Sequence, residues 1–215
     1  MIENERITAY INSLEPPESH ICEVIRKEAL ADLVPIIRSE TASLLKFFVH
    51  LTKPKSILEV GTAVGYSVIL MSECMPEDAH ITTIEKYEPR IPAAKKNFQR
   101  AEKEDKITLL EGDALEILHS LEGSYDFIFM DAAKGQYIHF LPDVMRLLAP
   151  GGLLISDNIL QDGDVVESRF AVTRRNRTIH SRMREYIYRL KHIPELQTAI
   201  IPIGDGVAVS TKKEL

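Results

Sequence analysis

Five short apolar runs in the middle of the chain alternate with stretches of helical periodicity, and this alternation constrains the fold more than any other feature. The runs are Ser56–Val60, His80–Glu85, Ile107–Glu111, Tyr125–Met130 and Gly152–Ser156. Runs of this length predict strands, and the amphipathic stretches between them predict helices. A strand, a helix and a second strand in succession form a right-handed crossover, so the two strands lie parallel. The pattern therefore predicts an α/β protein with a mostly parallel sheet and helices on both faces.

The two ends of the chain depart from this alternation. Apolar residues at helical spacing predict extra N-terminal helices over residues 1–53, and Pro16 and Pro17 separate the first from the second. Near the other end, Gln197–Pro202 and Gly206–Ser210 are joined by a tight glycine turn, which predicts an antiparallel hairpin at one edge. We therefore expect a single domain over residues 1–215, with a seven-stranded core over residues 54–215.

Composition and charge exclude several classes of protein. Apolar residues make up 45% and charged residues 27% of the chain, a balance that argues against disorder or a fibre. No apolar run approaches the roughly 18 residues of a membrane span, and the first residues lack the order of a signal peptide, so we expect no membrane contact and a cytoplasmic location. Cys22 and Cys74 form no CxxC pair, which predicts two buried thiols rather than a disulfide or a zinc site.

Polar residues and glycines gather where the first three runs end. The first run leads into E-V-G-T-A-V-G at residues 59–65, where glycines permit a sharp turn beside a ligand. Glu85 ends the second run, where its carboxylate can accept hydrogen bonds from both hydroxyls of a ribose, and Asp113 follows the third. The spacing differs from the G-x-G-x-x-G of dinucleotide-binding proteins, which disfavours a nicotinamide oxidoreductase. In this order the elements resemble the S-adenosylmethionine-binding half of the Rossmann-like class I methyltransferases, from Ser56 to Asn158.

Three oxygen-bearing side chains follow the fourth and fifth runs. Asp131 comes directly after the fourth, and Asp157 and Asn158 come directly after the fifth. Because neighbouring parallel strands bring their carboxyl ends to the same edge, these side chains are expected to meet around one ion. Two carboxylates and an amide suit Mg²⁺ or another hard divalent cation. Each residue alone would fit a turn or a helix cap equally well, so the prediction depends on the trio.

The stretch D-A-A-K-G-Q-Y at residues 131–137, followed by S-D-N at residues 156–158, resembles the cation-dependent O-methyltransferases, which include catechol and caffeoyl-CoA methyltransferases. The resemblance implies S-adenosylmethionine as cofactor and Mg²⁺ held by Asp131, Asp157 and Asn158. It also implies that Lys134, with Asp131 beside it, is catalytic and takes the proton of the acceptor hydroxyl; spacing alone would favour a surface lysine. The residues that it implies for cofactor binding are Ile37, Glu59, Gly61, Gly65, Ser67, Glu85, Asp113, Ala114 and Asp131.

A basic segment follows the last predicted metal ligand. Between Ser168 and Lys191 there are seven arginines and one lysine against the single acid Glu185, although the whole chain has a net charge of −6. Arginine binds phosphate through a planar fork, which makes Arg174, Arg175 and Arg177 candidates for RNA contacts. A solvated helix face or one packed on an acidic partner is the alternative. The overall negative charge argues against indiscriminate nucleic-acid binding, and no DNA partner is expected.

A narrower resemblance concerns the acceptor. D-A-A-K-G-Q-Y, D-N-I-L at residues 157–160 and Q-T-A-I-I-P-I-G-D-G-V-A-V-S at residues 197–210 resemble the bacterial tRNA 5-hydroxyuridine methyltransferases. This implies tRNA as partner, with 5-hydroxyuridine at the wobble position of the anticodon loop converted to 5-methoxyuridine. Tyr137, Phe170 and Tyr186 are candidates for stacking on the base, or core residues. A small catechol or caffeoyl-type acceptor and a non-catalytic cofactor- or RNA-binding module remain as alternatives. The resembled family also implies a homodimer.

Overall fold

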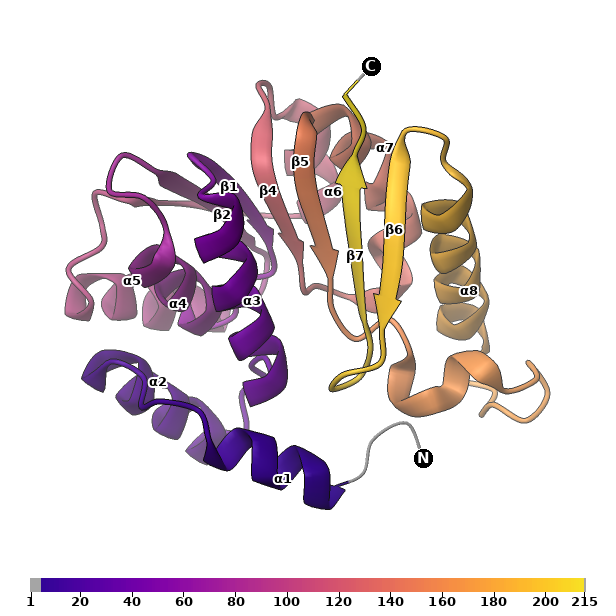
Figure 1. Ribbon diagram of the computed structural model, residues 1–215, viewed down its shortest axis with the longest axis horizontal. Helices are drawn as coiled ribbons and strands as arrows, with labels where there is room; N and C mark the ends of the chain where they lie inside the picture. Colours follow the sequence, from indigo (N-terminus) through magenta and orange to yellow (C-terminus); the bar gives the residue numbers. More distant parts are fainter. Residues whose placement is uncertain (1–4, 215) are drawn as a thin grey trace.

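The computed structural model describes residues 5–214, so the ends of the predicted domain, residues 1–4 and 215, lie outside the described residues. Its centre is a seven-stranded sheet in the order β3-β2-β1-β4-β5-β7-β6 (Figure 1). The strands are β1 Ser56–Val60, β2 His80–Glu85, β3 Ile107–Glu111, β4 Tyr125–Met130, β5 Leu148–Ser156, β6 Leu196–Ile201 and β7 Val207–Lys212. The strands β1 to β5 pair in parallel, and β7 runs antiparallel to both β5 and β6. The predicted α/β fold, with a mostly parallel sheet and an antiparallel hairpin, is confirmed.

The fifth strand begins earlier than its apolar pattern predicts. β5 starts at Leu148 rather than at Gly152, and its register against β4 shifts between Tyr125 and Phe127. Gly151 has a φ of +75°, a conformation that glycine adopts without strain, and the chain passes through the irregularity there before pairing resumes. An irregularity of this kind leaves no alternating apolar signal, so the sequence pattern identified only the regular half of the strand.

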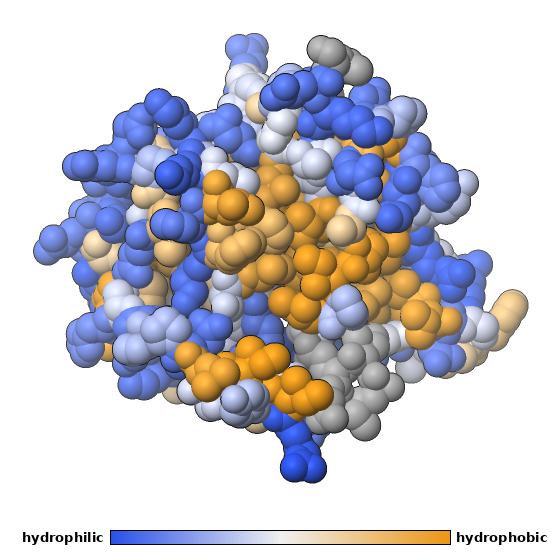
Figure 2. All heavy atoms as spheres, viewed as in Figure 1, coloured by the Kyte–Doolittle hydropathy of each residue, from blue (hydrophilic) through white to orange (hydrophobic). Residues whose placement is uncertain are grey.

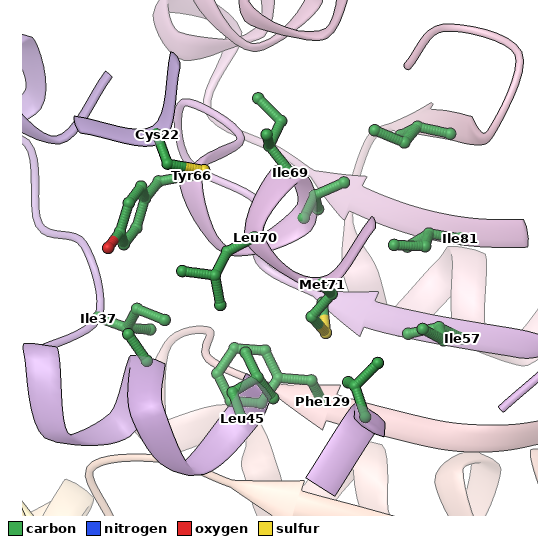
Figure 3. Packing of buried hydrophobic residues seen from close by; sticks show 14 of the residues in the cluster. Cys22, Ile37, Leu45, Ile57, Tyr66, Ile69, Leu70, Met71, Ile81 and Phe129 are labelled. Atoms are coloured by element: carbon green, nitrogen blue, oxygen red, sulfur yellow. The ribbon is translucent and has the colours of Figure 1, made fainter. Parts of the chain in front are cut away.

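Helices cover both faces of the sheet, as the sequence predicts. The helices are α1 Glu5–Ser13, α2 His20–Ala31, α3 Ser39–Thr52, α4 Tyr66–Cys74, α5 Ile91–Arg100, α6 Ala114–Ser120, α7 Tyr137–Leu147 and α8 Arg177–His192, with short 3₁₀ turns η1 Glu88–Arg90, η2 Lys134–Gln136 and η3 Gln161–Val166. Successive strand residues point to opposite faces. In β4, Phe127 and Phe129 therefore belong to the core cluster that includes residues of α2, α3, α4 and α5, part of which Figure 3 shows, while Ile128 and Met130 pack with α6, α7 and α8.

The two cysteines differ in burial. Cys22 is fully buried in the core between the sheet and α2 to α5, whereas Cys74 is only partly buried at the end of α4. The prediction of two buried thiols therefore holds for Cys22 alone. No helix within residues 5–214 is long and apolar enough to cross a membrane.

One surface of the molecule is strongly apolar. We call it the apolar face; its exposed residues lie on α1, directly after α1 and on α3, and are Ile7, Tyr10, Ile11, Leu14, Phe47 and Leu51. Figure 2 shows apolar side chains gathered over this region. A groove of about 510 Å³ runs between α1 and α3 and reaches Pro202 and Ile203, which follow β6.

Candidate active site

The carboxyl ends of the parallel strands are held in line at one edge of the sheet. The backbone N–H of Asp131 donates to Val60 at 3.0 Å, and that of Asp157 donates to Met130 at 3.0 Å, so each residue continues the pairing of its strand. The backbone N–H of Gly61 likewise donates to Ile84 at 3.0 Å. A cavity of about 950 Å³ opens at this edge. Its centre lies beside β1 and β4, where the direction of strand succession reverses, which is where α/β sheets bind ligands.

Two glycines shape the turn after β1. Gly61 has a φ of +100°, and a side chain there would collide with the backbone carbonyl of Asp131. Gly65 has a φ of +87° and precedes α4; a Cβ atom there would lie 2.6 Å from Cε1 of Phe98 on α5. Gly61 lines the cavity, whereas Gly65 lies outside its lining and packs against α5 instead. Gly65 therefore packs against α5 in this structure, and its predicted cofactor contact stays a prediction.

Glu85 lies at the cavity, as predicted, and also holds the glycine turn. Its carboxylate accepts hydrogen bonds from the backbone N–H groups of Ala63 at 2.8 Å, Lys86 at 2.9 Å and Tyr87 at 2.7 Å. These contacts tie the turn after β1 to the end of β2. The side chain lines the cavity and is almost buried, which keeps a negative group at a defined position there.

Glu59 lies beneath the cavity rather than in it. Its carboxylate is wholly buried and accepts hydrogen bonds from Ser67 Oγ at 2.5 Å and from Thr83 Oγ1 at 2.6 Å. Burial raises the pKa of Glu59 to about 7, although the two hydrogen bonds oppose the shift. Ser67 lines the cavity whereas Glu59 does not, so Glu59 is linked to the cavity through its hydrogen bond with Ser67, and its predicted cofactor contact stays a prediction.

The remaining predicted cofactor residues line the same cavity; they are Ile37, Gly61, Ser67, Glu85, Asp113, Ala114 and Asp131. Asp113 accepts a hydrogen bond from the backbone N–H of Leu115 at 2.9 Å and so caps α6. Lys86 Nζ lies 2.6 Å from Asp113 Oδ2 and, together with that cap, holds the pKa of the Asp113 carboxyl below its usual range. Glu85, Lys86 and Asp113 mark one end of the cavity, formed by β2, β3 and the start of α6.

The other end of the cavity holds the predicted catalytic lysine and two of the predicted metal ligands. Lys134 Nζ donates to Asp131 Oδ1 at 2.8 Å and to Asn158 Oδ1 at 2.7 Å. It also lies 3.2 Å from the hydroxyl of Tyr137, which donates to the carbonyl of Met130 at 2.9 Å. Asn158 has a φ of +54°, which asparagine tolerates better than most residues. The oxygens of Asp131 and Asn158 therefore converge on a single positive group.

Asp157, the third residue of the predicted trio, lies beneath the cavity and does not line it. It is almost fully buried, and burial, followed by the negative charge of Asp131, raises its pKa to about 6. Its Oδ1 accepts hydrogen bonds from the backbone N–H of Asn158 at 2.7 Å and from Thr41 Oγ1 at 3.4 Å. Within residues 5–214 no three His, Cys, Asp or Glu side chains converge as metal ligands. Two neighbouring carboxylates and an amide oxygen are nonetheless a set of ligands that fits a hard divalent ion.

The basic segment is divided between structural and exposed arginines. Arg182 Nη1 donates to the carbonyl of Gly135 in η2 at 3.0 Å, and Arg184 Nη1 donates to the carbonyl of Val165 at 3.1 Å. Arg177 is half-buried, and its guanidinium lies 5.9 Å from the ring centre of Phe170. Arg174 and Arg175, in contrast, are exposed. Of the predicted RNA-binding trio, the structure thus leaves these two side chains facing solvent, outside the cavity lining.

The three aromatic candidates for stacking also separate. Tyr137 and Tyr186 are fully buried and pack edge to face with ring centres 5.4 Å apart. The Tyr186 hydroxyl shares a 2.6 Å hydrogen bond with Ser156 Oγ. Both are core residues, so the stacking role is corrected for them. Phe170 is 84% exposed and remains a candidate.

Sequence reasoning missed several charged and aromatic residues of the cavity lining, namely Arg38, Lys86, Tyr87 and Arg90. None of them belongs to a spaced motif, and each reaches the cavity because of how its segment packs. Lys86 and Tyr87 directly follow Glu85, so their closeness to a predicted site residue was the available signal. Arg38 offered no such signal except its position next to Ile37.

Comparison with known proteins gives consistent findings along the chain. The sequence profile of the O-methyltransferase family matches residues 13–213. A catechol O-methyltransferase of Niastella koreensis is 37% identical over 128 residues, which cover 57% of this chain and 58% of that relative. A caffeoyl-CoA O-methyltransferase of Eucalyptus gunnii is 30% identical over 190 residues, covering 82% of this chain and 74% of that relative.

Solved structures resemble the fold closely. A Staphylococcus aureus protein assigned to the caffeoyl-CoA O-methyltransferases is 34% identical, with a TM-score of 0.88 over 97% of this chain and 100% of that one. A methyltransferase of Podospora anserina, solved with bound S-adenosylhomocysteine (SAH), also has a TM-score of 0.88, over 98% of this chain and 95% of that one, at 24% identity. At that identity the second likeness shows the fold alone.

Proposed function

The chain belongs to the O-methyltransferase family, and from that premise we propose that it transfers a methyl group from S-adenosylmethionine to a hydroxyl oxygen, with the help of a divalent cation such as Mg²⁺. The observation that carries the proposal is the arrangement of Asp131, Lys134 and Asn158 at one end of a cavity whose other end holds Glu85 and Asp113. The SAH bound to the Podospora anserina protein of the same fold supports the choice of cofactor.

The residues of the chain divide the work of this reaction. S-adenosylmethionine would supply the methyl group, and a cation held by Asp131, Asp157 and Asn158 would stabilise the acceptor as an oxyanion. Gly61, Glu85 and Asp113 bind and orient the cofactor beside β1, β2 and β3. Lys134, in its amine form, takes the proton of the acceptor hydroxyl at Nζ.

Two contacts keep the nitrogen of Lys134 at the acceptor end of the cavity. The buried hydroxyl of Tyr137 lies 3.2 Å from Nζ and is itself fixed by the carbonyl of Met130. Asp131 Oδ1 lies 2.8 Å from Nζ on the other side. A base held in this way meets a bound acceptor in one geometry, which is a large part of what catalysis of a methyl transfer requires.

For the acceptor we propose 5-hydroxyuridine in the anticodon loop of tRNA, converted to 5-methoxyuridine. Its 5-hydroxyl and 4-carbonyl are neighbouring oxygens, like those of a catechol. Arg174 and Arg175 are exposed for phosphate contacts, and Arg182 joins the same segment to η2, which carries Lys134. A base in an anticodon loop can be turned out of its stack into a cavity.

A small catechol or caffeoyl-CoA-type acceptor is the second candidate, and the curated relatives favour it by name. The apolar residues Pro35, Ile36 and Ile37 in the cavity lining would suit an aromatic ring. A non-catalytic binding module is disfavoured by the convergence of Lys134, Asp131 and Asn158.

The double charge reversal Arg174→Glu with Arg175→Glu separates the two acceptors. Methylation of hydroxyuridine-containing tRNA is expected to fall by about 100-fold, because phosphate attraction becomes repulsion, while turnover of a free catechol and binding of S-adenosylmethionine stay unchanged. The matched control is Lys27→Glu with Lys53→Glu, which makes the same change of charge at two other exposed positions. Undiminished tRNA methylation in the first variant, or efficient turnover of catechols alone by the wild type, would favour the small-molecule acceptor.

A further inference from the structure

We propose that Arg38 forms an anion-binding subsite at the acceptor end of the cavity and selects acceptors that carry a phosphate or carboxylate close to the reacting oxygens. The inference rests on the proposed methyl transfer for the identity of the acceptor end. It concerns a residue that no motif in the chain singles out.

The position of Arg38 places its guanidinium at the acceptor end. Arg38 directly precedes α3 and lines the cavity. Thr41, one turn further along α3, donates to Asp157 Oδ1 at 3.4 Å. A Cβ atom on Gly204, in the turn before β7, would lie 3.4 Å from Thr41 Oγ1 and 3.7 Å from Cδ of Arg38. Arg38 is therefore a neighbour of the proposed metal ligands, whereas Glu85 and Asp113 mark the opposite end.

The cations at the cofactor end are already engaged. Lys86 Nζ lies 2.6 Å from Asp113, with which it forms an ion pair, and Arg90 lies over the ring of Tyr87 at 5.1 Å. These contacts neutralise or cover the positive groups near the ends of β2 and β3. An anionic acceptor that enters the cavity is therefore met by Arg38 rather than by Lys86 or Arg90.

Arg38 holds its own partner only weakly. Its Nη2 lies 3.4 Å from Asp162 Oδ1, and the two side chains are 50% and 85% exposed. Pairs with this exposure contribute little, because water screens them and both side chains lose conformational freedom. The guanidinium can therefore exchange Asp162 for a substrate anion at small cost, and a planar guanidinium matches two oxygens of a phosphate or carboxylate.

Asp162 lies in η3, in a turn with two left-handed residues. Gln161 and Asp162 both have a φ of +52°, and the backbone N–H of Asp162 donates to the carboxylate of Asp205. The Asp162 carboxylate therefore lies within reach of Arg38, where it competes with any incoming anion for the guanidinium. Removal of the Asp162 charge and removal of the Arg38 charge should thus change the preference for anionic acceptors in opposite directions.

The test compares acceptors that differ only in the anionic group. One pair is 5-hydroxyuridine and its 5′-monophosphate, and the other is 3,4-dihydroxybenzyl alcohol and 3,4-dihydroxybenzoate. Dissociation constants are measured by calorimetry in the presence of Mg²⁺ and SAH, so that no reaction occurs. The variants are Arg38→Ala and Asp162→Asn. Lys53→Gly, at the other end of α3, is the matched control, because it removes a cation where the left-handed backbone accepts glycine.

The wild type is expected to bind the anionic member of at least one pair about fivefold more tightly, which is the size of one charge-assisted contact at a half-exposed site. Arg38→Ala should bring that ratio to about one with the neutral member unaffected, Asp162→Asn should increase it, and Lys53→Gly should leave it unchanged. The pair that responds identifies the anion as a nucleotide phosphate or an aromatic carboxylate.

Two results would overturn the role of Arg38: equal binding of charged and neutral acceptors by the wild type, or equal weakening of both members of a pair by Arg38→Ala. Failure of the proposed function has a different signature. If the wild type methylates none of the four acceptors and no hydroxyuridine-containing tRNA, the methyl transfer is wrong, whereas the binding ratios still report on Arg38.

Discussion

Lys134 joins the proposed chemistry into one hydrogen-bond network, because its Nζ contacts Asp131, Asn158 and the hydroxyl of Tyr137. Each partner is fixed by the fold: Asp131 by its backbone bond to Val60, and Tyr137 by burial between β4 and α8. The side chain is therefore held in place before any substrate arrives. This is the property expected of a base that must meet one oxygen in one orientation.

Replacement of Lys134 by alanine should lower kcat by at least about 100-fold, the usual contribution of a positioned base. Binding of S-adenosylmethionine should change little, because Glu85 and Asp113 lie at the other end of the cavity. Lys134→Arg is the informative control: it keeps the positive charge but cannot release its proton near neutral pH. Steady-state kinetics and cofactor titration measure the two effects, and an active Lys134→Arg variant would exclude proton transfer through this residue.

Removal of divalent cations should abolish turnover, since the acceptor oxygen is a poor nucleophile without one. Dialysis against a chelator tests this, and Mg²⁺ should restore activity in the wild type but not in Asp157→Ala. Folding of both proteins is checked by circular dichroism. Full activity after chelation, or in Asp157→Ala, would contradict the assignment of Asp131, Asp157 and Asn158 as metal ligands.

Glu59 makes the stability of the protein depend on pH. Burial raises its pKa from 4.5 to about 7, so the proton on Glu59 stabilises the folded state, and this contribution is complete below about pH 4.5 and lost as the pH rises through about 7. Relative to the wild type, Glu59→Gln should therefore gain free energy of unfolding between pH 5 and pH 8, by up to about 3 kcal/mol. Urea unfolding at both values measures the gain, with exposed Glu122→Gln as control. If the difference in free energy of unfolding between Glu59→Gln and the wild type were the same at pH 5 and at pH 8, the raised pKa of Glu59 would be disproved.

Individual site residues were predictable to the extent that they end a strand. Glu85, Asp131 and Asn158 lie where the sequence pattern places them, because parallel strands deliver their last residues to a common edge. The position of Glu59 beneath the cavity was not predicted, because its place within the motif does not tell which face of β1 it occupies. Arg38 was missed because its closeness to Asp157 depends on the packing of α3 against the turn before β7, which no local pattern encodes.

At the scale of secondary structure, the turn between β1 and α4 determines how closely two strands approach. Gly61 brings its backbone against the carbonyl of Asp131, so the ends of β1 and β4 are in direct contact at the cavity. Gly123 provides a natural comparison: it has the same φ of +100°, but a Cβ atom added there would meet nothing within 4 Å. The two positions share backbone strain and differ only in crowding.

Alanine at Gly123 should therefore cost about 1–2 kcal/mol, the strain of a left-handed residue. Alanine at Gly61 should cost this and about 1–3 kcal/mol more, because Asp131 must move, and it should also weaken binding of S-adenosylmethionine. Thermal unfolding and cofactor titration of the two variants measure the difference. If the two variants were equally destabilised, Asp131 could move away from residue 61 without a cost in stability.

The strands could be predicted from the sequence because each has a continuous apolar run. Irregular segments have no such run and could not be predicted. The predicted bounds of β1 to β4 agree with the structure, and those of β6 and β7 differ by one or two residues. The first half of β5 was not predicted, because its glycines interrupt the apolar pattern. The basic segment was readable as charge but not as contacts, since arginines that bond to backbone carbonyls and arginines that face solvent look the same in a sequence.

At the scale of the whole molecule, the apolar face is unusual for a protein that stays monomeric in water. Ile7, Ile11 and Phe47 are each half-exposed or more, and they surround the groove between α1 and α3. A contiguous exposed apolar surface of this kind usually marks a protein–protein contact. We therefore propose that two copies of the chain associate through the apolar face.

Sedimentation of the wild type is expected to give twice the mass of one chain, and Ile11→Asp with Phe47→Asp to give a folded monomer, because two charges would be buried without partners. Tyr188→Asp on α8 is the control, since this side chain is also exposed but lies on the opposite side of the sheet. A wild type that sediments as a single chain over a wide range of concentration would rule out the dimer.

The strand order has a consequence for how the protein is made. β7 is the last strand in the chain, yet it lies inside the sheet, where it pairs with β5 on one side and with β6 on the other. During synthesis, β5 keeps an unsatisfied edge and β6 has nowhere to dock until residues 207–212 have left the ribosome. The nascent protein must therefore wait, with apolar surface uncovered, until residues 207–212 have emerged, and termination before residue 207 would remove an internal strand and leave β6 in solvent.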